Sequence, residues 1–129
     1  PEEQEEEGHR ILHKGFEVAQ MMKVIGEEGT ALNDFIEYLK AEFFDFVYLQ
    51  QNAFDPVDEA TSAERQKYIF EFIFRILKAQ FTFKDKDEAR HFFQSLRQEF
   101  KGWNSSPWKS AEFGKIEKDI VALLSSKIK

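Results

Sequence analysis

The sequence predicts an all-α protein, a bundle of about five helices that forms a single domain over residues 1–129. Apolar residues recur every three or four positions through most of the chain, as they do in helices that bury one face. The period-two alternation of strands and the Asn-Gly or Asp-Gly turns of hairpins are absent. A chain of 129 residues suits one compact domain and is too short for two ordinary ones.

The first helix is expected over about residues 9–25, and the acidic residues 1–8 before it are expected to fray. Gly26 follows the last apolar residue of the pattern, where helices commonly end in a left-handed residue. Gly26-Glu27-Glu28-Gly29 is therefore expected to be a short polar turn. The apolar positions of this helix are Ile11, Leu12, Phe16, Val18, Ala19, Met22 and Ile25.

A second helix is expected over about residues 31–49, with Pro56 ending the helical pattern because proline disfavours a helical residue before it. The third is expected over about residues 62–81, where Thr61-Ser62-Ala63-Glu64 has the pattern of a capping box. Its polar stripe is narrow, which is typical of a central helix packed on two faces. The stripe consists of Glu71, Arg75 and Lys78.

The fourth helix is expected over about residues 86–103, and residues 104–106 interrupt the pattern. Ser106-Pro107 predicts the start of a fifth helix, with serine as the cap and proline in the first turn.

Charge and composition exclude several functions. The net charge of -6 argues against nucleic acid as a partner and against binding to an anionic membrane surface. No apolar run approaches the roughly 18 residues of a membrane span, so direct membrane insertion is not expected. The chain has no cysteine, which excludes disulfides and thiol chemistry within it. It begins at Pro1 without an initiator methionine, and we interpret it as a processed chain or a piece of a longer one.

No motif for autonomous catalysis is present, and we assign no catalytic residue. Gly-x-Ser-x-Gly is missing, as is a glycine loop that could hold phosphate. His9, His13 and Glu17 would share one helix face, a weak pattern for a metal site. We interpret them as a solvated face and assign no metal ligand.

Two features leave alternatives open. The 15 phenylalanines predict an aromatic core, an interface with a missing neighbour, or both for different residues. The segment at residues 49–58 is either a connector with Phe54 in the core or a loop that offers a flat ring, with amides nearby, to a planar ligand.

Leu-Gln-Gln-Asn-Ala-Phe-Asp-Pro-Val-Asp at residues 49–58 resembles the C-terminal helical domain of the catalytic A subunit of V-type and A-type rotary ATPases. Ser-Ala-Glu-Arg-Gln at 62–66 and Val-Ile-Gly-Glu-Glu at 24–28 are similar to two further stretches of that subunit. The resemblance covers about residues 20–70. Beyond them only the helical pattern is similar, and residues 90–103 match no motif that we recognise.

The resemblance implies that this chain completes the adenine side of a nucleotide site. Phe54 would lie against the adenine, with Gln51, Asn52 and Ala53 as the adjacent wall. The phosphate loop and catalytic glutamate of the family belong to a separate nucleotide-binding domain. ATP or ADP with Mg is therefore expected in the full subunit, and no cofactor is expected in this chain alone.

The resemblance also implies a mechanical role at the polar turn. Gly26, Glu27, Glu28 and Gly29 are similar in position to the helix-loop-helix that presses on the rotor in F-type enzymes. The implied partners are the central-stalk subunit, the B subunit and the nucleotide-binding domain of the same subunit. The implied location is the cytoplasm, peripheral to the membrane as part of the ATPase head.

Two functions from other classes remain as alternatives. The first is a free-standing helical interaction domain whose aromatic groove binds a partner helix. The second is a small helical enzyme with a buried carboxylate site. A phosphate-loop domain upstream in the same reading frame would favour the rotary ATPase interpretation over both.

Overall fold

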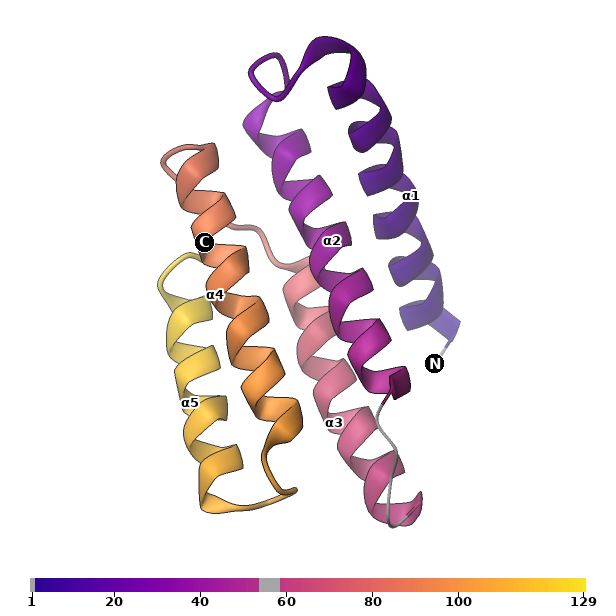
Figure 1. Cartoon of the computed structure of the whole chain (residues 1–129), viewed down its shortest axis with the longest axis vertical. Helices are drawn as coiled ribbons and strands as arrows, with labels where there is room; N and C mark the ends of the chain where they lie inside the picture. The colour runs from indigo at the N-terminus through magenta and orange to yellow at the C-terminus, as the bar shows by residue number, and fades with distance from the viewer. Residues whose placement is uncertain (1, 54–58) are drawn as a thin grey trace.

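The computed structural model describes residues 2–53 and 59–129, and within them the protein is an all-α bundle, which confirms the predicted fold class (Figure 1). α2 packs against α1, α3 and α4, and α5 packs against α4. The helices are α1 (Glu2–Ile25), α2 (Leu32–Ala53), α3 (Glu59–Lys78), α4 (Lys86–Ser105) and α5 (Ala111–Ser125). The described residues form no extended strand, and a single antiparallel bridge joins Phe81 to Ile128.

α1 begins at Glu2, so the expectation that residues 1–8 fray was wrong for the described residues. Glutamates near a helix N-terminus are stabilised by the helix dipole, which favours an early start. Glu7 also pairs with Arg10 one turn later, with 2.6 Å between Oε1 and Nη2. Ile11 is fully buried, so the following turn is fixed to the rest of the bundle.

The middle helices also differ from the sequence prediction at their ends. α2 runs to Ala53, one turn beyond the expected end. α3 starts at Glu59, so residues 61–64 lie inside the helix and the predicted capping box was wrong. Glu59 and Ala60 are good helix formers, and they extend the helix in the N-terminal direction. α3 ends at Lys78 rather than near 81, because Phe81 turns away to form the bridge with Ile128.

The fifth helix begins after Ser110 rather than at Ser106, which corrects the prediction. Ser106 instead closes α4, since its backbone N–H and its hydroxyl both donate to the Trp103 carbonyl, at 3.2 and 2.7 Å. The Ser110 hydroxyl accepts from the Phe113 backbone N–H at 3.1 Å and is the actual cap. Lys109, between the two serines, has φ 61° and reverses the chain.

The core is built largely of aromatic rings, which confirms the first interpretation of the phenylalanines for most of them. Trp103 is fully buried, and its ring stacks on Phe113 with 4.9 Å between centroids. α3 meets rings of α2 on one side, through Phe74 and Phe44, and rings of α4 and α5 on the other. The prediction that α3 is packed on two faces is therefore confirmed. Phe16, one of the apolar positions of the first helix, is an exception and is 63% exposed.

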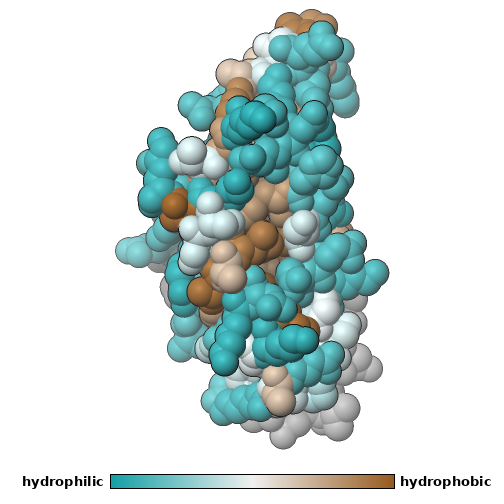
Figure 2. All heavy atoms as spheres, turned by 90° about the vertical axis from the view of Figure 1, so that its left-hand side faces the viewer, coloured by the Kyte–Doolittle hydropathy of each residue, from teal (hydrophilic) through white to brown (hydrophobic). Residues whose placement is uncertain are grey.

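The face formed by α4 and α5 is hydrophilic at its edges and carries apolar atoms near its centre (Figure 2). On these two helices and the C-terminal residues that follow, the large apolar side chains that remain exposed are Val121 and Ile128. None of the described helices is long and apolar enough to cross a membrane.

Candidate functional site

The two sites predicted from the sequence lie at opposite ends of α2 (Figure 1). The turn at residues 26–29 joins α1 to α2 at one end, and Gln51, Asn52 and Ala53 form the last turn of α2 at the other. The 22 residues of α2 correspond to roughly 33 Å of helix. Phe54 lies outside the described residues, and the side chains of residues 51–53 are likewise not described.

The turn has a defined backbone. Gly26 adopts φ 79° and donates its N–H to the Met22 carbonyl at 2.8 Å, which confirms the predicted left-handed end of α1. No heavy atom lies within 4 Å of a Cβ built at Gly26, so glycine is required there for its φ angle rather than for space. Thr30 is buried, and its hydroxyl donates to the Gly26 carbonyl at 3.0 Å. These bonds close the turn on itself.

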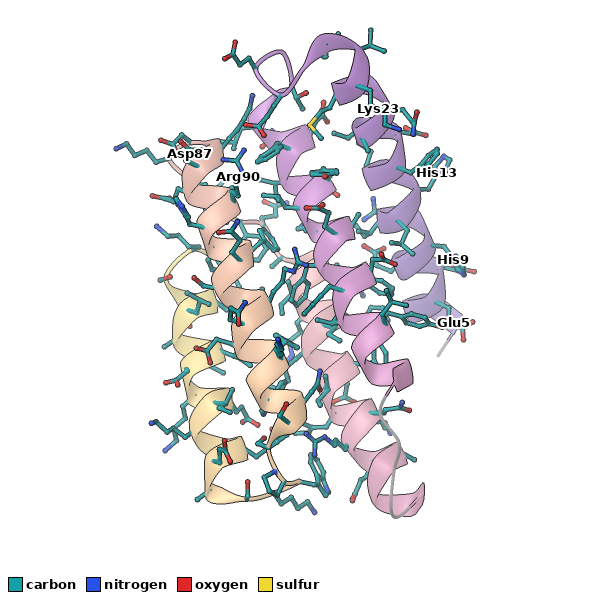
Figure 3. All side chains as sticks on the ribbon, viewed as in Figure 1. Glu5, His9, His13, Lys23, Asp87 and Arg90 are labelled. Carbon is teal, nitrogen blue, oxygen red and sulfur yellow. The ribbon has the colours of Figure 1, made fainter. Side chains whose placement is uncertain are left out.

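Glu27 connects the turn to the start of α4. The Glu27 carboxylate pairs with Arg90, with 2.5 Å between Oε1 and Nη2, and Arg90 also pairs with Asp87 at 2.5 Å. The Lys86 ammonium donates to the Glu27 backbone carbonyl at 2.5 Å. The hydrogen bond with Glu27 is the main cause that raises the pKa of the Arg90 guanidinium above its usual value. Asp87 and Arg90 lie near the N-terminal end of α4, on the side of the bundle nearest the turn (Figure 3).

The remaining surface of the turn is exposed. Glu28 is exposed, and no base of the described chain lies within ion-pair distance of it. Val24 is 85% exposed and Ile25, the last apolar position of the first helix, is 49% exposed. The last turn of α1 therefore presents two apolar side chains beside a free carboxylate, and we call Val24, Ile25 and Glu28 the tip surface.

A hollow of about 520 Å³ lies next to the turn, between α1, α2 and α4. Its floor is apolar, and its rim carries charges of both signs, including Lys23, Glu27 and Arg90. Tyr38 on this rim donates to Glu42 at 2.8 Å. Burial and that hydrogen bond raise the pKa of Tyr38 to about 12. The floor residues include Phe35, Leu39 and Phe93.

The model of the family described as the C-terminal domain of V and A type ATP synthase matches residues 3–89 of this chain. The chain belongs to this family.

Curated relatives extend the similarity over nearly the whole chain. The V-type ATP synthase alpha chain of Treponema denticola is 49% identical over 127 residues, which are 98% of this chain and 22% of the relative. The alpha chain of Borrelia duttonii is 49% identical over 117 residues, 91% of this chain and 20% of the relative. The chain thus spans about a fifth of the length of these relatives. No solved structure matches it significantly.

The V/A-type match is wider than the resemblance found by motif, which covered about residues 20–70. It includes α1, α2, α3 and the first residues of α4, and it ends one residue before Arg90. Residues 90–103 matched no known part of the family on sequence motifs alone. The Treponema relative nevertheless aligns over 98% of the chain, so this stretch has counterparts, and the earlier expectation was too narrow.

The contact between the turn and α4 was missed by the sequence analysis of this V/A-type domain. Glu27 and Arg90 are 63 residues apart, and no local pattern links them. Glu27 and Glu28 are equivalent in the sequence pattern, whereas in the structure Glu27 pairs with Arg90 and Glu28 has no base within ion-pair distance in the described chain. The basic residues Lys86 and Arg90, one turn apart at the start of a helix, were the available signal, because that is where the dipole disfavours cations.

The histidines of α1 point outward, away from the rest of the bundle (Figure 3). His13 contacts Glu17, with 2.7 Å between Nε2 and Oε1, and both side chains are exposed. Among residues 2–53 and 59–129 no group of three or more histidine, aspartate and glutamate side chains converges to hold a metal ion.

Proposed function

We propose that this V/A-type domain transmits movement between the nucleotide site of a catalytic alpha subunit and the central stalk of the rotary enzyme. The observation that carries the proposal is the continuity of α2. This helix begins two residues after Thr30 and runs without a break to Ala53, so one rigid element joins the turn to the residues at the opposite end. A displacement at one end of such a helix appears at the other.

The end of α2 contributes the adenine side of the nucleotide site in this proposal. The Phe54 ring lies against the adenine, and Gln51, Asn52 and Ala53 form the wall beside it. A flat apolar ring with amides next to it suits a planar heterocycle that bears hydrogen-bonding nitrogens. The phosphates and Mg of ATP or ADP are held by the nucleotide-binding domain of the same subunit, and no residue described here is assigned to them.

The opposite end contacts the rotor. Residues 26–29, with the tip surface beside them, meet the central-stalk subunit. The exposed apolar centre of the α4–α5 face is available to a neighbour, and we assign the B subunit to it (Figure 2). The assembled head lies in the cytoplasm, peripheral to the membrane.

The bundle itself moves as one body in this mechanism. Nucleotide occupancy closes the nucleotide-binding domain, the bundle swings, and the turn displaces the stalk. The aromatic core supports this role, because a close-packed interior transmits strain rather than absorbing it. Two buried cations also join helices that are distant in sequence, Lys40 from α2 to α3 and Arg65 from α3 to α4.

Cross-linking in the assembled ATPase tests the proposal. The chain contains no cysteine, so Glu28→Cys introduces a single reactive thiol into it. We expect this thiol to cross-link to the central stalk, whereas Lys67→Cys on the exposed side of α3 does not. Efficient cross-linking from Lys67 but not from Glu28 would place the stalk on the wrong side of the bundle for this mechanism.

The adenine assignment has its own test. Phe54→Ala in the complete enzyme is expected to raise the KM for ATP, because stacking on a base is worth about 1–3 kcal/mol. Phe16→Ala removes an equally large ring that is exposed on α1 and should leave KM unchanged. An unchanged KM in Phe54→Ala would contradict the proposed contact with adenine. It would leave the proposed contact of residues 26–29 with the central stalk unaffected.

A further inference from the structure

We propose that Arg90 is a positioning residue for the rotor-facing turn. Its contact with Glu27 holds the turn against α4, so that the turn moves together with the bundle and transmits this movement to the stalk. The inference rests on the proposed function, since it concerns how the same turn is held. It assigns different roles to the two glutamates of the turn. Glu27 fixes the direction of the turn, and Glu28 faces the partner.

Arg90 connects three elements of the structure. Its guanidinium pairs with Glu27 in the turn and with Asp87 in its own helix, each at 2.5 Å. The same group lies over the ring of Phe35 in α2, 5.3 Å from the centroid. A planar guanidinium with several donors suits such a junction, because it can hold two carboxylates and a ring face in fixed directions.

The turn has no comparable link to the rest of the bundle among the described residues. Apart from the bond that Lys86 donates to Glu27, its other hydrogen bonds are local, from Gly26 to Met22 and from Thr30 to Gly26 and Glu27. They shape the turn without tying it to α3, α4 or α5. Among the described residues, both hydrogen-bonded links from the turn to α4 meet at Glu27, one at the carboxylate from Arg90 and one at the backbone carbonyl from Lys86.

The start of α4 is itself anchored, so it can serve as a fixed point. The connector before α4 is bonded to the C-terminal residues, from the Thr82 N–H to Lys127 O at 2.7 Å and from the Lys129 N–H to Gln80 O at 2.9 Å. The Lys127 ammonium also lies 3.1 Å from the Glu88 carboxylate in the first turn of α4. One continuous series of contacts thus runs from the C-terminal residues through the connector and α4 to the turn.

Exposed ion pairs contribute little to the overall stability of a protein, so the effect of this junction is expected to be local. Arg90→Gln should raise amide hydrogen exchange in residues 26–30 by up to about fivefold, without a change in α3. In the assembled enzyme the same variant should lower the torque, or the number of ions moved per ATP, while the KM for ATP stays unchanged.

Three variants make the test specific. Arg97→Gln is the matched control, because Arg97 lies two turns further along α4, over Phe46, and pairs with no carboxylate in the described chain. It should change neither exchange in the turn nor torque. The double variant Glu27→Arg with Arg90→Glu should restore both in part, because it rebuilds the pair across the turn with the charges exchanged but loses the contacts of Arg90 with Asp87 and Phe35. Glu28→Gln should leave exchange in the turn unchanged.

The outcomes separate this inference from the proposed function. If Glu28→Cys fails to cross-link to the stalk while Arg90 is present, the proposed function itself has failed. If the cross-link forms and Arg90→Gln alters neither exchange nor torque, only the positioning role is overturned. A loss of torque that the exchanged pair does not recover even in part also overturns it, because the loss would then come from something other than the contact with Glu27.

Discussion

The ammonium group of Lys40, in the middle of α2, donates a hydrogen bond of 2.9 Å to the backbone carbonyl of Leu77 in the last turn of α3. A second bond of 2.8 Å goes to the Ala79 carbonyl. The last carbonyls of a helix have no partner within the helix, so the buried lysine supplies a donor to the buried Leu77 carbonyl and to the half-buried Ala79 carbonyl that follows it. Arg65 serves α4 in a similar way, with bonds of 2.8 and 2.7 Å to the Trp103 and Asn104 carbonyls.

Lys40→Met should therefore destabilise the domain even though methionine has a similar length and removes a buried charge. The substitution takes the donor from the buried carbonyl of Leu77 and from the half-buried carbonyl of Ala79, which costs about 1–3 kcal/mol. Urea unfolding followed by circular dichroism measures the difference. Lys67→Met, at an exposed position of α3, should change the free energy of unfolding by less than about 0.5 kcal/mol. Equal effects of the two variants would contradict a special role for Lys40.

The pH dependence of stability should also carry a signature of Lys40. Burial lowers the pKa of this lysine below its usual 10.5. Between the folded and unfolded pKa values the unfolded chain binds more protons, so stability rises with pH in that range. The free energy of unfolding of the natural protein, minus that of Lys40→Met, should therefore increase as the pH approaches 10.5 from below. A difference that falls over this range would show that the folded protein favours the charged form.

These contacts mark the limit of what the sequence could predict. The helices themselves follow from local apolar spacing, and the end of α1 follows from Gly26, because each signal lies within a few residues. Lys40 and Leu77 are 37 residues apart, and the choice of Ser110 over Ser106 as a cap depends on where Trp103 and Phe113 pack. The residues proposed for the nucleotide side rest on a motif alone, because Phe54 and the side chains of residues 51–53 are not among those that the structure describes.

The space around Gly15 in α1 and Gly114 in α5 predicts opposite effects when each is replaced by alanine. A Cβ at Gly15 would lie 2.2 Å from Ala41 Cβ, so Gly15→Ala must push the two helices apart, at a cost of about 1–3 kcal/mol. A Cβ at Gly114, inside α5, would meet nothing within 4 Å. Gly114→Ala should therefore stabilise the domain by about 0.5–1 kcal/mol through helix propensity. Thermal unfolding of both variants is the measurement, and destabilisation by Gly114→Ala would show that α5 is more crowded than described.

Tyr68 should stay protonated at a pH where tyrosine normally ionises. Its hydroxyl donates to the Glu117 carboxylate at 2.5 Å, and this bond is the main cause that raises the pKa of Tyr68 to about 12. The folded protein then holds the proton more tightly than the unfolded chain, so this stabilisation is lost as the pH rises above 10.0. Tyrosinate absorbance of the natural protein and Tyr68→Phe should be the same near pH 10 and diverge only towards pH 12. Divergence already near pH 10 would contradict the raised pKa.

The chemistry of the tip surface predicts that apolar contact, more than charge, joins this domain to the stalk. Of the two carboxylates in the turn, Glu27 is paired with Arg90, and only Glu28 remains for a partner. Val24 and Ile25 expose large apolar areas beside it, and burying such side chains is worth roughly 1.5–3 kcal/mol each. A partly solvated ion pair is worth about 1 kcal/mol or less and weakens with salt.

Replacing Val24 and Ile25 together by serine in the assembled enzyme should therefore impair rotation more than Glu28→Gln does, and the difference should persist at high salt. Both residues are exposed, so the isolated domain should keep its stability within about 1 kcal/mol. Single-molecule rotation at low and high salt, with urea unfolding of the isolated domain, measures the two effects. Phe16→Ser is the control, because it removes an exposed ring from the flank of α1 and not from its end. If Phe16→Ser impairs rotation and the double serine variant does not, the stalk meets the flank of α1 and the tip surface is free.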